Sequence, residues 1–505
     1  MKVVLLNPPT AFNSRGVLLN LAYLSAKLKQ EGHIVKIIDA IAPYNTLSES
    51  EVKNIVEIYK PDFIGITLPI DYLPDTYDFI KYLSSIKIPI VAGGPHANCL
   101  PEEVLNHSVD IVVLGEGENT IIELTDYFLG KKKLEDVSGI CYKSKDGSFK
   151  YTKQQPLIHD LDSIPFPDLD SFPIKNYTGS NNPSSSPTFW SIFSSRGCPY
   201  NCTFCSSHNV FGRNYRSRSP KNIVKEIEEV SEKYGAHMFA FQDDEAFIDK
   251  KRIIEFCNLI KEKKLNLKFS ARMRIDNLDV DMLRNMKYVG FKRLAFGIES
   301  LNDETLLKVN KMYKVKNVFE GFEILKEVRF RAIHFNLIIG FPWETPEHLN
   351  KNFEEIKKFD KSHLLFISTV NPVPYPGTKL YEDHYKEYEF DGWWLDEKRN
   401  SKQPQVKSFF MLFMFSQFPL FKKDLFWNYS PEMEKAIEKF CFDVASYCLK
   451  QHYSLSLFLA IYYLCKASHL IWKKAPLLER ILFYPLKKIV EFTKLDKRMK
   501  FVNYY

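Results

Sequence analysis

Short apolar runs alternate with amphipathic stretches over the first 150 residues. A helical spacing of Val17, Leu21, Leu24 and Leu28 predicts a helix over residues 17–31, and another helix is expected over residues 74–85. The runs rich in Val, Ile, Leu or Phe predict strands at residues 2–6, 34–39, 63–68, 88–92 and 111–114. Near-continuous apolar strands separated by helices are typical of a parallel sheet covered on both faces. Residues 1–150 are therefore expected to form a Rossmann-like domain.

A second series of βα units follows a linker. Residues 151–187 contain Pro165, Pro167, Pro173 and the run Asn-Asn-Pro-Ser-Ser-Ser, which mark irregular chain. Helices such as 221–234 and 250–263 then separate six expected strands, at residues 189–194, 238–242, 267–271, 293–298, 334–339 and 364–370. Six units predict a partial (β/α)6 barrel of the TIM type over residues 188–395, with its chemistry at the carboxyl ends of the strands.

The remaining residues, 396–505, lose this alternation and are expected to form a C-terminal helical domain. Residues 408–421 and 451–465 are uncharged and rich in Phe, Leu and Tyr, but each is shorter than the ~20 apolar residues of a membrane-spanning helix. Residues 466–505 hold ten Lys or Arg and three Asp or Glu. We interpret this region as a helical cap with a solvated basic face. Peripheral contact with an anionic membrane surface is the alternative.

Composition narrows the class of protein. A chain of 505 residues with 45% hydrophobic and 26% charged residues is expected to fold into two or three globular domains. The net charge of +7, from 69 basic and 62 acidic residues, is too small for this length to indicate nucleic-acid binding. The first apolar run is broken by Pro8 and Pro9, so no export signal is expected and a cytoplasmic location is predicted.

Three of the nine cysteines lie within eight residues and carry the strongest chemical signal. Cys198, Cys202 and Cys205 follow a predicted strand with the spacing CxxxCxxC. Thiolates are soft ligands for iron–sulfur clusters or zinc. A structural zinc site needs four ligands, and no fourth Cys or His lies at a zinc-finger spacing, although His208 is near. Three thiolates on a four-iron cluster would leave one iron open for a chelating substrate.

This motif, with Phe204 before its third cysteine, resembles the radical S-adenosylmethionine (SAM) superfamily. The resemblance implies a [4Fe-4S] cluster on the three cysteines, with SAM at the open iron. One electron then cleaves SAM to methionine and a 5′-deoxyadenosyl radical, which abstracts hydrogen from an unactivated carbon. It also implies an oxygen-sensitive enzyme that needs an electron donor such as flavodoxin or ferredoxin.

Other strand ends resemble the SAM-binding segments of that family. The resemblance implies that Asp243 and Asp244 receive the methionine ammonium, that Arg272 or Arg274 receives the carboxylate, and that Glu299 and Ser300 bind ribose. Asn336 and Gly340 resemble the adenine-binding segment, although Trp343 stands where the family commonly has Gly. An ordinary acidic turn and surface ion pairs are the alternatives for the charged residues.

The first domain resembles the cobalamin-binding domain that precedes this barrel in one large subfamily. The implied contacts are Asn7, Thr67, Gly93, Gly94, His96, Gly115 and Glu116. The Asp-x-His-x-x-Gly loop that supplies a cobalt ligand in many cobalamin proteins is absent. His33 and His96 are therefore interpreted as structural, and the loop at residues 67–71 would face cobalt without a protein ligand.

Both cofactors together imply methylation of an unreactive carbon or phosphorus centre, with one SAM methylating the cobalamin and a second generating the radical. A radical cyclase or oxidoreductase is the first alternative, and a non-catalytic corrinoid-binding or electron-carrying protein is the second. The substrate is expected to be a small molecule. Six phenylalanines between residues 409 and 421 would suit a lipid or tetrapyrrole, or simply a packed core.

Overall fold

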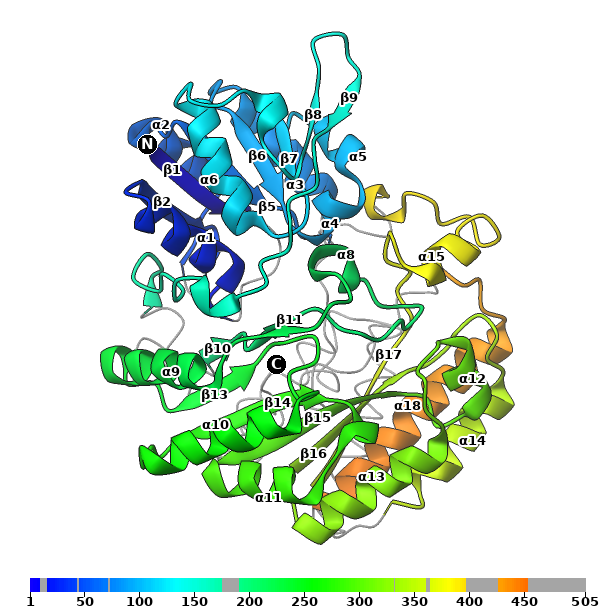
Figure 1. Ribbon diagram of the computed structural model, residues 1–505. Coiled ribbons are helices and arrows are strands. Elements are labelled where there is room, and N and C mark those ends of the chain that lie inside the picture. The colour runs from blue at the N-terminus through cyan, green and yellow to red at the C-terminus, as the bar shows by residue number, and fades with distance from the viewer. Residues whose placement is uncertain are drawn as a thin grey trace, which may run out of the picture.

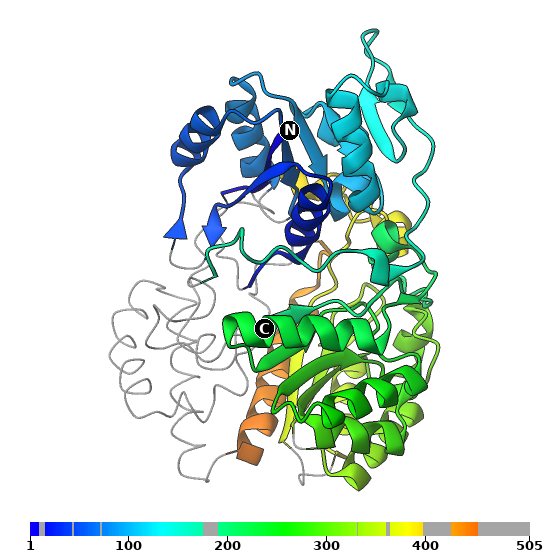
Figure 2. The same cartoon turned by 60° about the vertical axis from the view of Figure 1, so that its left-hand side comes forward.

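The computed structural model describes residues 1–9, 16–42, 45–70, 73–174, 190–330, 332–359, 364–396 and 426–452. Two largely parallel sheets dominate it, and the chain between them crosses from one to the other (Figure 1, Figure 2). The α/β class, the parallel N-terminal sheet and the partial barrel predicted from the sequence are confirmed. The exact domain limits remain predictions.

The N-terminal sheet has the order β2-β1-β5-β6-β7-β8-β9. Its parallel part consists of β1 (Lys2–Asn7), β2 (Ile34–Asp39), β5 (Phe63–Thr67), β6 (Ile90–Gly93) and β7 (Ile111–Val113). The antiparallel hairpin of β8 (Ile140–Lys143) and β9 (Phe149–Tyr151) extends one edge. A second, small hairpin joins β3 (Ile41–Ala42) to β4 (Asn45–Thr46). Neither hairpin was predicted from the sequence.

Helices cover both faces of this sheet because successive side chains of a strand point to opposite sides. Val3 and Leu5 of β1 pack with α1 (Leu19–Gln30) and α6 (Gly117–Phe128). The alternate residues Val4 and Leu6 pack with α2 (Glu49–Tyr59) and α3 (Leu73–Ser84). Two short helices, α4 (Pro95–Cys99) and α5 (Pro101–Leu105), follow β6, and α4 lies at the edge nearest the barrel.

The barrel is an open sheet of six parallel strands in sequence order. These are β10 (Trp190–Ile192), β13 (Met238–Phe241), β14 (Lys268–Met273), β15 (Phe291–Glu299), β16 (Ala332–Ile338) and β17 (Leu364–Val370). Its outer helices are α9 (Pro220–Tyr234), α10 (Lys250–Glu262), α11 (Val280–Val289), α12 (Asp303–Lys308), α13 (Val315–Val328) and α14 (Pro346–Ile356). Between β10 and β13 lie the short ribbon β11 (Ser195–Arg196) with β12 (Arg216–Ser217) and the helix α8 (His208–Phe211).

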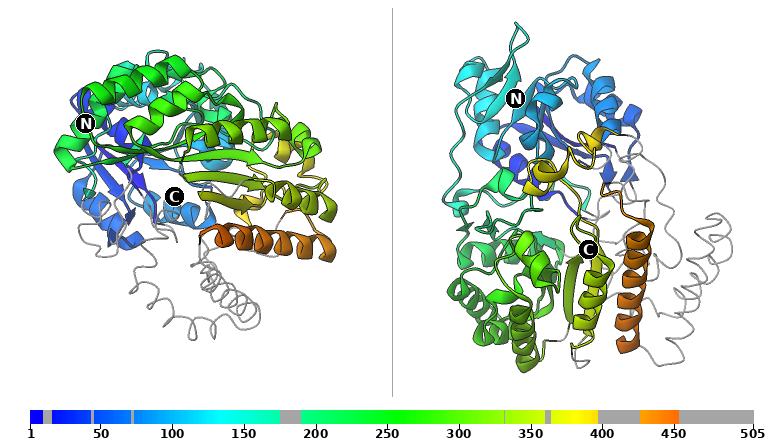
Figure 3. Two further views of the ribbon diagram at one scale, coloured as in Figure 1. Left: turned by 90° about the horizontal axis from the view of Figure 1, so that it is seen from below. Right: turned by 90° about the vertical axis from the view of Figure 1, so that its right-hand side faces the viewer.

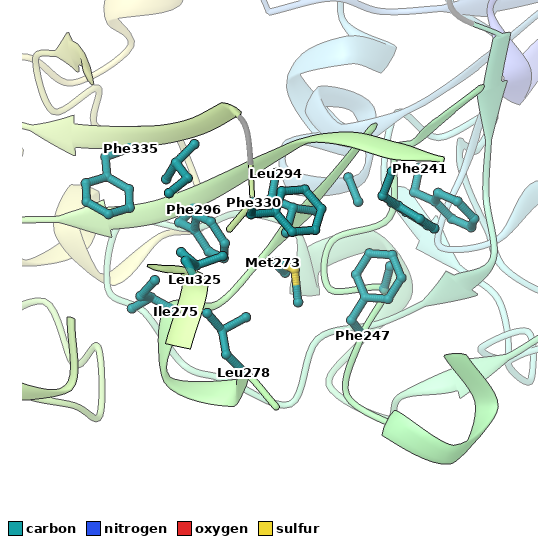
Figure 4. Packing of buried hydrophobic residues seen from close by; sticks show 14 of the residues in the cluster. Phe241, Phe247, Met273, Ile275, Leu278, Leu294, Phe296, Leu325, Phe330 and Phe335 are labelled. Atoms are coloured by element: carbon teal, nitrogen blue, oxygen red, sulfur yellow. The ribbon is translucent and has the colours of Figure 1, made fainter. Parts of the chain in front are cut away.

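Phenylalanine fills much of the space between the barrel strands and their helices. Phe241 packs against Phe247 with ring centroids 5.6 Å apart, and Phe296 packs against Phe335 at 6.1 Å (Figure 4). All four side chains are buried. Because alternate strand residues point into the barrel, this apolar layer leaves the lumen to a different set of side chains.

The chain beyond the barrel returns to the N-terminal sheet before it packs on the barrel again. α15 (Lys379–His384) and a 3-10 helix (Trp393–Leu395) contribute to the core that also contains Ile64 of β5. Trp394 Nε1 donates to Glu103 of α5 at 2.7 Å. The helix α18 (Pro431–His452) then lies along β17 and α14 (Figure 3).

The C-terminal helical prediction holds where α18 is described, whereas residues 408–421, 466–505 and most of 451–465 lie outside the described residues. The same is true of the linker residues 175–187. In the part of the chain that the structure describes, no helix has both the length and the apolar character needed to cross a membrane.

Candidate active site

A cavity of about 530 Å³ lies at the carboxyl ends of the barrel strands. Its walls come from the cysteine loop after β11, from β14 to β17, and from the turns after β13 and α12. The lining residues are Cys198, Tyr200, Cys202, Phe204, Cys205, Ser207, Asp244, Glu245, Arg272, Met273, Arg274, Ala295, Gly297, Glu299, Lys311, His334, Asn336, Ser368 and Val370. This is where ligands bind in barrels of this class.

The cysteine loop is braced from two sides at Thr203. The Thr203 N–H donates to the carbonyl of Val309 at 3.1 Å, and its carbonyl accepts from the N–H of Leu380 at 2.8 Å. These bonds tie the loop to the turn after α12 and to the start of α15. As a result, the structure brings all three predicted ligands to one cavity, namely Cys198, Cys202 and Cys205.

This donor set fits an iron–sulfur cluster. Among the described residues, no three His, Cys, Asp or Glu side chains converge closely enough to hold a single metal ion. Three thiolates can each bind a separate iron of one iron–sulfur cluster. Burial raises the pKa of Cys198 to about 11, so this thiol needs a metal to displace its proton.

The acidic turn after β13 divides into two parts. Asp243 is buried and accepts from the N–H of Ser194 at 2.7 Å and the hydroxyl of Ser195 at 2.6 Å, so it anchors the strand end outside the cavity lining. Asp244 and Glu245 do line the cavity. Burial raises the pKa of Asp244 to about 6 and that of Glu245 to about 7. Glu245 Oε1 is buried without a hydrogen-bond partner, as a site for a bound cation would be.

A buried ion pair forms another part of the wall. Lys311 Nζ donates to Glu299 Oε1 at 2.8 Å. Glu299 has a left-handed backbone with φ 65°, and Gly297 makes room for its carboxylate, which a Cβ at that position would strike. Asn310 and Met312, on either side of Lys311, are also left-handed at φ 54° and 65°. Backbone strain of this kind is concentrated at functional sites.

Arg272 of β14 and Arg274, which directly follows that strand, both line the cavity but differ in their surroundings. Arg274 makes two hydrogen bonds of 3.0 Å to the carboxylate of Asp276, and its guanidinium lies 3.7 Å from the ring centroid of Tyr200 in the cysteine loop. Arg274 thus supports the loop, while Arg272 is exposed and lines the cavity.

The remaining predicted SAM contacts are only partly brought together. Phe204 and Asn336 line the cavity, whereas Ser300 and Gly340 do not. The Ser300 hydroxyl accepts from the N–H of Asn302 at 3.2 Å, at the start of α12. The Gly340 N–H donates to Glu344 at 2.8 Å, and its carbonyl accepts from the Tyr429 hydroxyl. The structure therefore places both residues in supporting turns.

Five of the predicted cobalamin contacts lie at the carboxyl edge of the N-terminal sheet, which is the edge nearest the barrel (Figure 1). They are Asn7, Thr67, Gly93, Gly94 and Gly115. Gly94 has a left-handed φ of 106°, and a Cβ there would lie 3.3 Å from Thr67 Oγ1. The loops after β5 and β6 can therefore approach this closely because position 94 is a glycine. The last residue of the loop expected to face cobalt, residue 71, lies outside the described residues.

His96 is enclosed by protein. Its Nε2 is 3.0 Å from Glu103 Oε1 and 3.3 Å from the Tyr77 hydroxyl, and its side chain is buried. His33 is instead near the surface, with Nδ1 at 3.3 Å from the terminal amine of Met1. These surroundings favour the structural interpretation of both histidines over cobalt ligation.

Glu116 belongs to a buried ionic junction between the N-terminal sheet and the β11–β12 ribbon. Its carboxylate accepts from Arg196 at 3.1 Å and from Arg216 at 2.9 Å. Arg196 also pairs with Glu118. Since Arg196 lies two residues before Cys198, residues 115–118, Gly-Glu-Gly-Glu, fix the cysteine loop against the N-terminal sheet. Glu116 was predicted as a corrin contact, and the structure places it in this junction.

We predict that Glu116→Gln lowers the free energy of unfolding by about 2 to 3 kcal/mol, the worth of a charge-assisted hydrogen bond that a neutral amide cannot replace. Chemical denaturation of the full chain would measure this. Glu135→Gln is the matched control, because Glu135 is exposed and only 3.7 Å from Lys133, a pair worth under about 1 kcal/mol. Equal losses in the two variants would contradict the junction.

The structure also adds lining residues to which the sequence analysis gave no role, although Tyr200 and Glu245 lie within the cysteine motif and the acidic turn. They are Tyr200, Glu245, Lys311, His334 and Ser368. Lys311 follows Glu299 by twelve positions on a separate turn, so spacing alone gave no signal. His334 and Ser368 do give one, since each is a polar residue at an inward position of a mostly apolar strand.

Two family models match the chain. The radical SAM superfamily model matches residues 192–356, and the B12 binding domain model matches residues 11–125. The first match contains the cysteine loop and the strands β13 to β16. The second contains β2, β5, β6 and β7 of the N-terminal sheet.

Known proteins are similar to this chain over most of its length. An uncharacterized methyltransferase of Pyrococcus horikoshii is 33% identical over 392 residues, which are 76% of this chain and 83% of the relative. The anaerobic magnesium-protoporphyrin IX monomethyl ester cyclase of Rubrivivax gelatinosus is 28% identical over 433 residues, 80% of this chain and 75% of the relative.

A solved structure supports the fold. The cobalamin-dependent SAM radical enzyme OxsB, with aqua-cobalamin and SAM bound, superposes with a TM-score of 0.64 at 19% identity. The match covers 80% of this chain and 57% of OxsB, so this chain spans little more than half of that protein. Together with the two family models and the Pyrococcus relative, the cysteine loop and the two sheets establish that the chain belongs to the radical SAM superfamily, in the group whose barrel follows a B12-binding domain.

Proposed function

We propose that this protein is a cobalamin-dependent radical SAM methyltransferase that acts on an unactivated carbon centre. One observation carries the proposal. The cavity that holds the three thiols also holds carboxylates and cations suited to SAM, and the loop that carries the thiols is fixed by Glu116 to the carboxyl edge of the B12-binding domain. The 33% identity to a relative named a methyltransferase supports the reaction type.

When bound, the cluster supplies the electron that cleaves SAM, and the corrin supplies the methyl group. The protein's own residues position and enclose the reactants. Asp244 and Glu245 hold the methionine ammonium, and the Arg272 guanidinium holds the carboxylate. Glu299, oriented by the hydrogen bond from Lys311, accepts hydrogen bonds from the ribose hydroxyls. Asn336 takes the next position along the lumen.

The apolar part of the lining excludes water from the reacting carbon. Phe204, Ala295 and Val370 line the cavity between its charged groups. Limiting the access of water protects reactive intermediates from side reactions, which is a general benefit of an enclosed site.

The test is an anaerobic assay of the reconstituted full chain with a chemical reductant, cobalamin and SAM carrying a deuterated methyl group. We expect 5′-deoxyadenosine, S-adenosylhomocysteine and a product that has gained the deuterated methyl group, with the product lost when cobalamin is omitted. Formation of 5′-deoxyadenosine without any methylated product, with or without cobalamin, would count against the proposal.

A radical cyclase is the second candidate, and the identity to the Rubrivivax cyclase favours it. It uses the same SAM cleavage but ends in ring closure. In the assay above, a cyclase would yield a product of unchanged carbon number. The electron donor, such as flavodoxin or ferredoxin, and contact of the C-terminal region with a membrane remain predictions in either case.

We predict that SAM affinity rises with pH because of Glu245. Burial raises the pKa of this carboxyl to about 7 and that of Asp244 to about 6, so both are neutral in acid and gain the charge that attracts an ammonium as the pH rises through these values. Equilibrium binding of SAM should strengthen between about pH 5.5 and about pH 8.

Glu245→Gln should weaken SAM binding by roughly 10- to 100-fold at neutral pH, the range of one charge-assisted hydrogen bond, and should flatten the upper part of the pH profile. Glu255→Gln, on the exposed face of α10, is the matched control and should change neither. An unaltered profile in the Glu245 variant would remove this residue from the ammonium site.

A further inference from the structure

A column of polar side chains crosses the barrel lumen beneath the cysteine loop. Asn336 of β16 stands directly opposite Ser368 of β17, and His334 lies two residues earlier on the same face of β16. Arg293 lies on the lumen face of β15, where Ala295, two residues on, is the register partner of His334. Their neighbour Phe335 points the other way, into the apolar layer (Figure 4).

Hydrogen bonds join these four side chains in one line. Arg293 Nη2 contacts His334 Nδ1. His334 Nε2 is 2.9 Å from Ser368 Oγ, and Ser368 Oγ is 2.7 Å from Asn336 Oδ1. Asn336 Nδ2 donates to the carbonyl of Phe296 at 3.4 Å. Arg293 and His334 are buried, and Ser368 is only 7% exposed.

The groups at the two ends of this line of hydrogen bonds, the Arg293 guanidinium and the Phe296 carbonyl, fix the direction of every bond between them. A guanidinium can only donate, so His334 Nδ1 must accept and the ring proton lies on Nε2. Nε2–H then donates to Ser368, whose own proton goes to Asn336 Oδ1. At the other end a backbone carbonyl can only accept, which requires the nitrogen of the Asn336 amide there. Burial and the nearby Arg293 and Arg272 lower the pKa of His334, so the neutral ring that this pattern needs is the stable form.

We propose that His334 and Ser368 are positioning residues that commit the Asn336 amide to act as a hydrogen-bond donor in the cavity. The Oδ1 atom is engaged by Ser368 and one amide proton by Phe296. The other proton remains for a ligand, because Asn336 lines the cavity. Asn336 therefore selects a ligand group that accepts a hydrogen bond. His334, held neutral and used on both nitrogens, is not an acid or base in the reaction.

The acceptor has two possible sources with the same chemistry, a ring nitrogen of the SAM adenine or a carbonyl or ether oxygen of the substrate. This inference rests on the proposed function in that both ligands share this cavity. The direction of the hydrogen-bond chain does not depend on which reaction follows.

The first test determines the direction of the hydrogen-bond chain from the position of the proton on His334. Nitrogen NMR of histidine-labelled holoprotein, with the cluster in its diamagnetic oxidised state, should show His334 with a protonated Nε2 and a bare Nδ1 from about pH 6 to about pH 8. The signal is assigned by its loss in His334→Gln. A proton on Nδ1, or a charged ring in this range, would overturn the proposal even if the enzyme is active.

The second test uses variants that change one hydrogen-bond role each. Asn336→Asp keeps the shape and the acceptor for Ser368 but removes the donor. It should weaken the affinity for the ligand that Asn336 contacts by roughly 10- to 100-fold. Ser368→Ala leaves the Asn336 amide free to rotate and should weaken the affinity for the same ligand by roughly 5- to 10-fold. Ser368→Thr keeps the hydroxyl and should retain most of that affinity. Asn258→Asp, on an exposed part of α10, is the control.

Two readouts separate the sources of the acceptor. Weaker equilibrium binding of SAM in Asn336→Asp assigns the contact to adenine. Unchanged SAM binding, with more 5′-deoxyadenosine formed per methylated product, assigns it to the substrate. Asn336→Asp that behaves like Asn258→Asp in both readouts, or Ser368→Ala that behaves like Ser368→Thr, would overturn the proposal. Absence of methylated product in the unaltered protein would instead count against the proposed function and leave the NMR test standing.

Discussion

Cys202→Ala is expected to abolish SAM cleavage, with a fall of roughly a thousandfold or more, because the bound cluster supplies the whole of the difficult step and the protein has no substitute for it. Cys202 lies between the other two thiols in the sequence and lines the same cavity, so its loss leaves two ligands for a cluster that needs three. Iron and sulfide analysis of the anaerobically reconstituted variant, together with its visible absorption, would report the cluster independently of activity.

Cys257→Ala is the matched control. Cys257 is buried in the barrel core on α10, and its replacement by alanine should cost about 1 kcal/mol of stability without changing the iron content. A Cys202 variant that binds as much iron and sulfide as this control, or an unaltered protein that binds zinc in place of iron, would contradict the cluster assignment on which the proposed function depends.

Lys311→Met is expected to lower the free energy of unfolding by about 3 to 5 kcal/mol, because it leaves the carboxylate of Glu299 buried without the ammonium that it faces. The two side chains are 7% and 10% exposed and 2.8 Å apart, and the methionine keeps most of the apolar length of the lysine. SAM binding should weaken as well, since Glu299 loses the partner that orients it. Chemical denaturation and equilibrium SAM binding measure the two effects.

A double variant separates these effects. Glu299→Gln combined with Lys311→Met removes both charges, so it should recover part of the stability while SAM binding stays weak. Lys308→Met, on the exposed surface of α12, should alter neither quantity. A double variant as unstable as Lys311→Met would show that the loss comes from packing and not from the unpaired charge.

The sequence predicted the architecture because its strands are long or nearly continuous in apolar residues. The runs at residues 2–6 and 63–68 correspond to β1 and β5, and the six expected barrel strands all exist in the expected order. The cysteine loop was equally predictable, since the three ligands lie within eight residues and share one short loop. Local spacing was enough to identify these features.

Features that depend on contacts across the fold were not predictable. Asp243 and Glu245 are two positions apart in the same acidic turn, and only the structure separates the carboxylate that holds the strand end from the one that reaches the cavity. Glu116 stands in a glycine-rich turn typical of ligand binding, yet its partners Arg196 and Arg216 are 80 and 100 residues away. A buried ionic contact of that range leaves no local pattern.

The aromatic residues after the barrel determine how late in synthesis the core of the N-terminal sheet can be completed. Trp394 completes the core of the N-terminal sheet and bonds to Glu103, 291 residues earlier in the chain. At the usual pace of a ribosome, about 15 to 60 s pass between the appearance of the two residues. During that interval, the nascent N-terminal half carries an unfinished apolar surface, and it matures only when the tryptophans that close it have been translated.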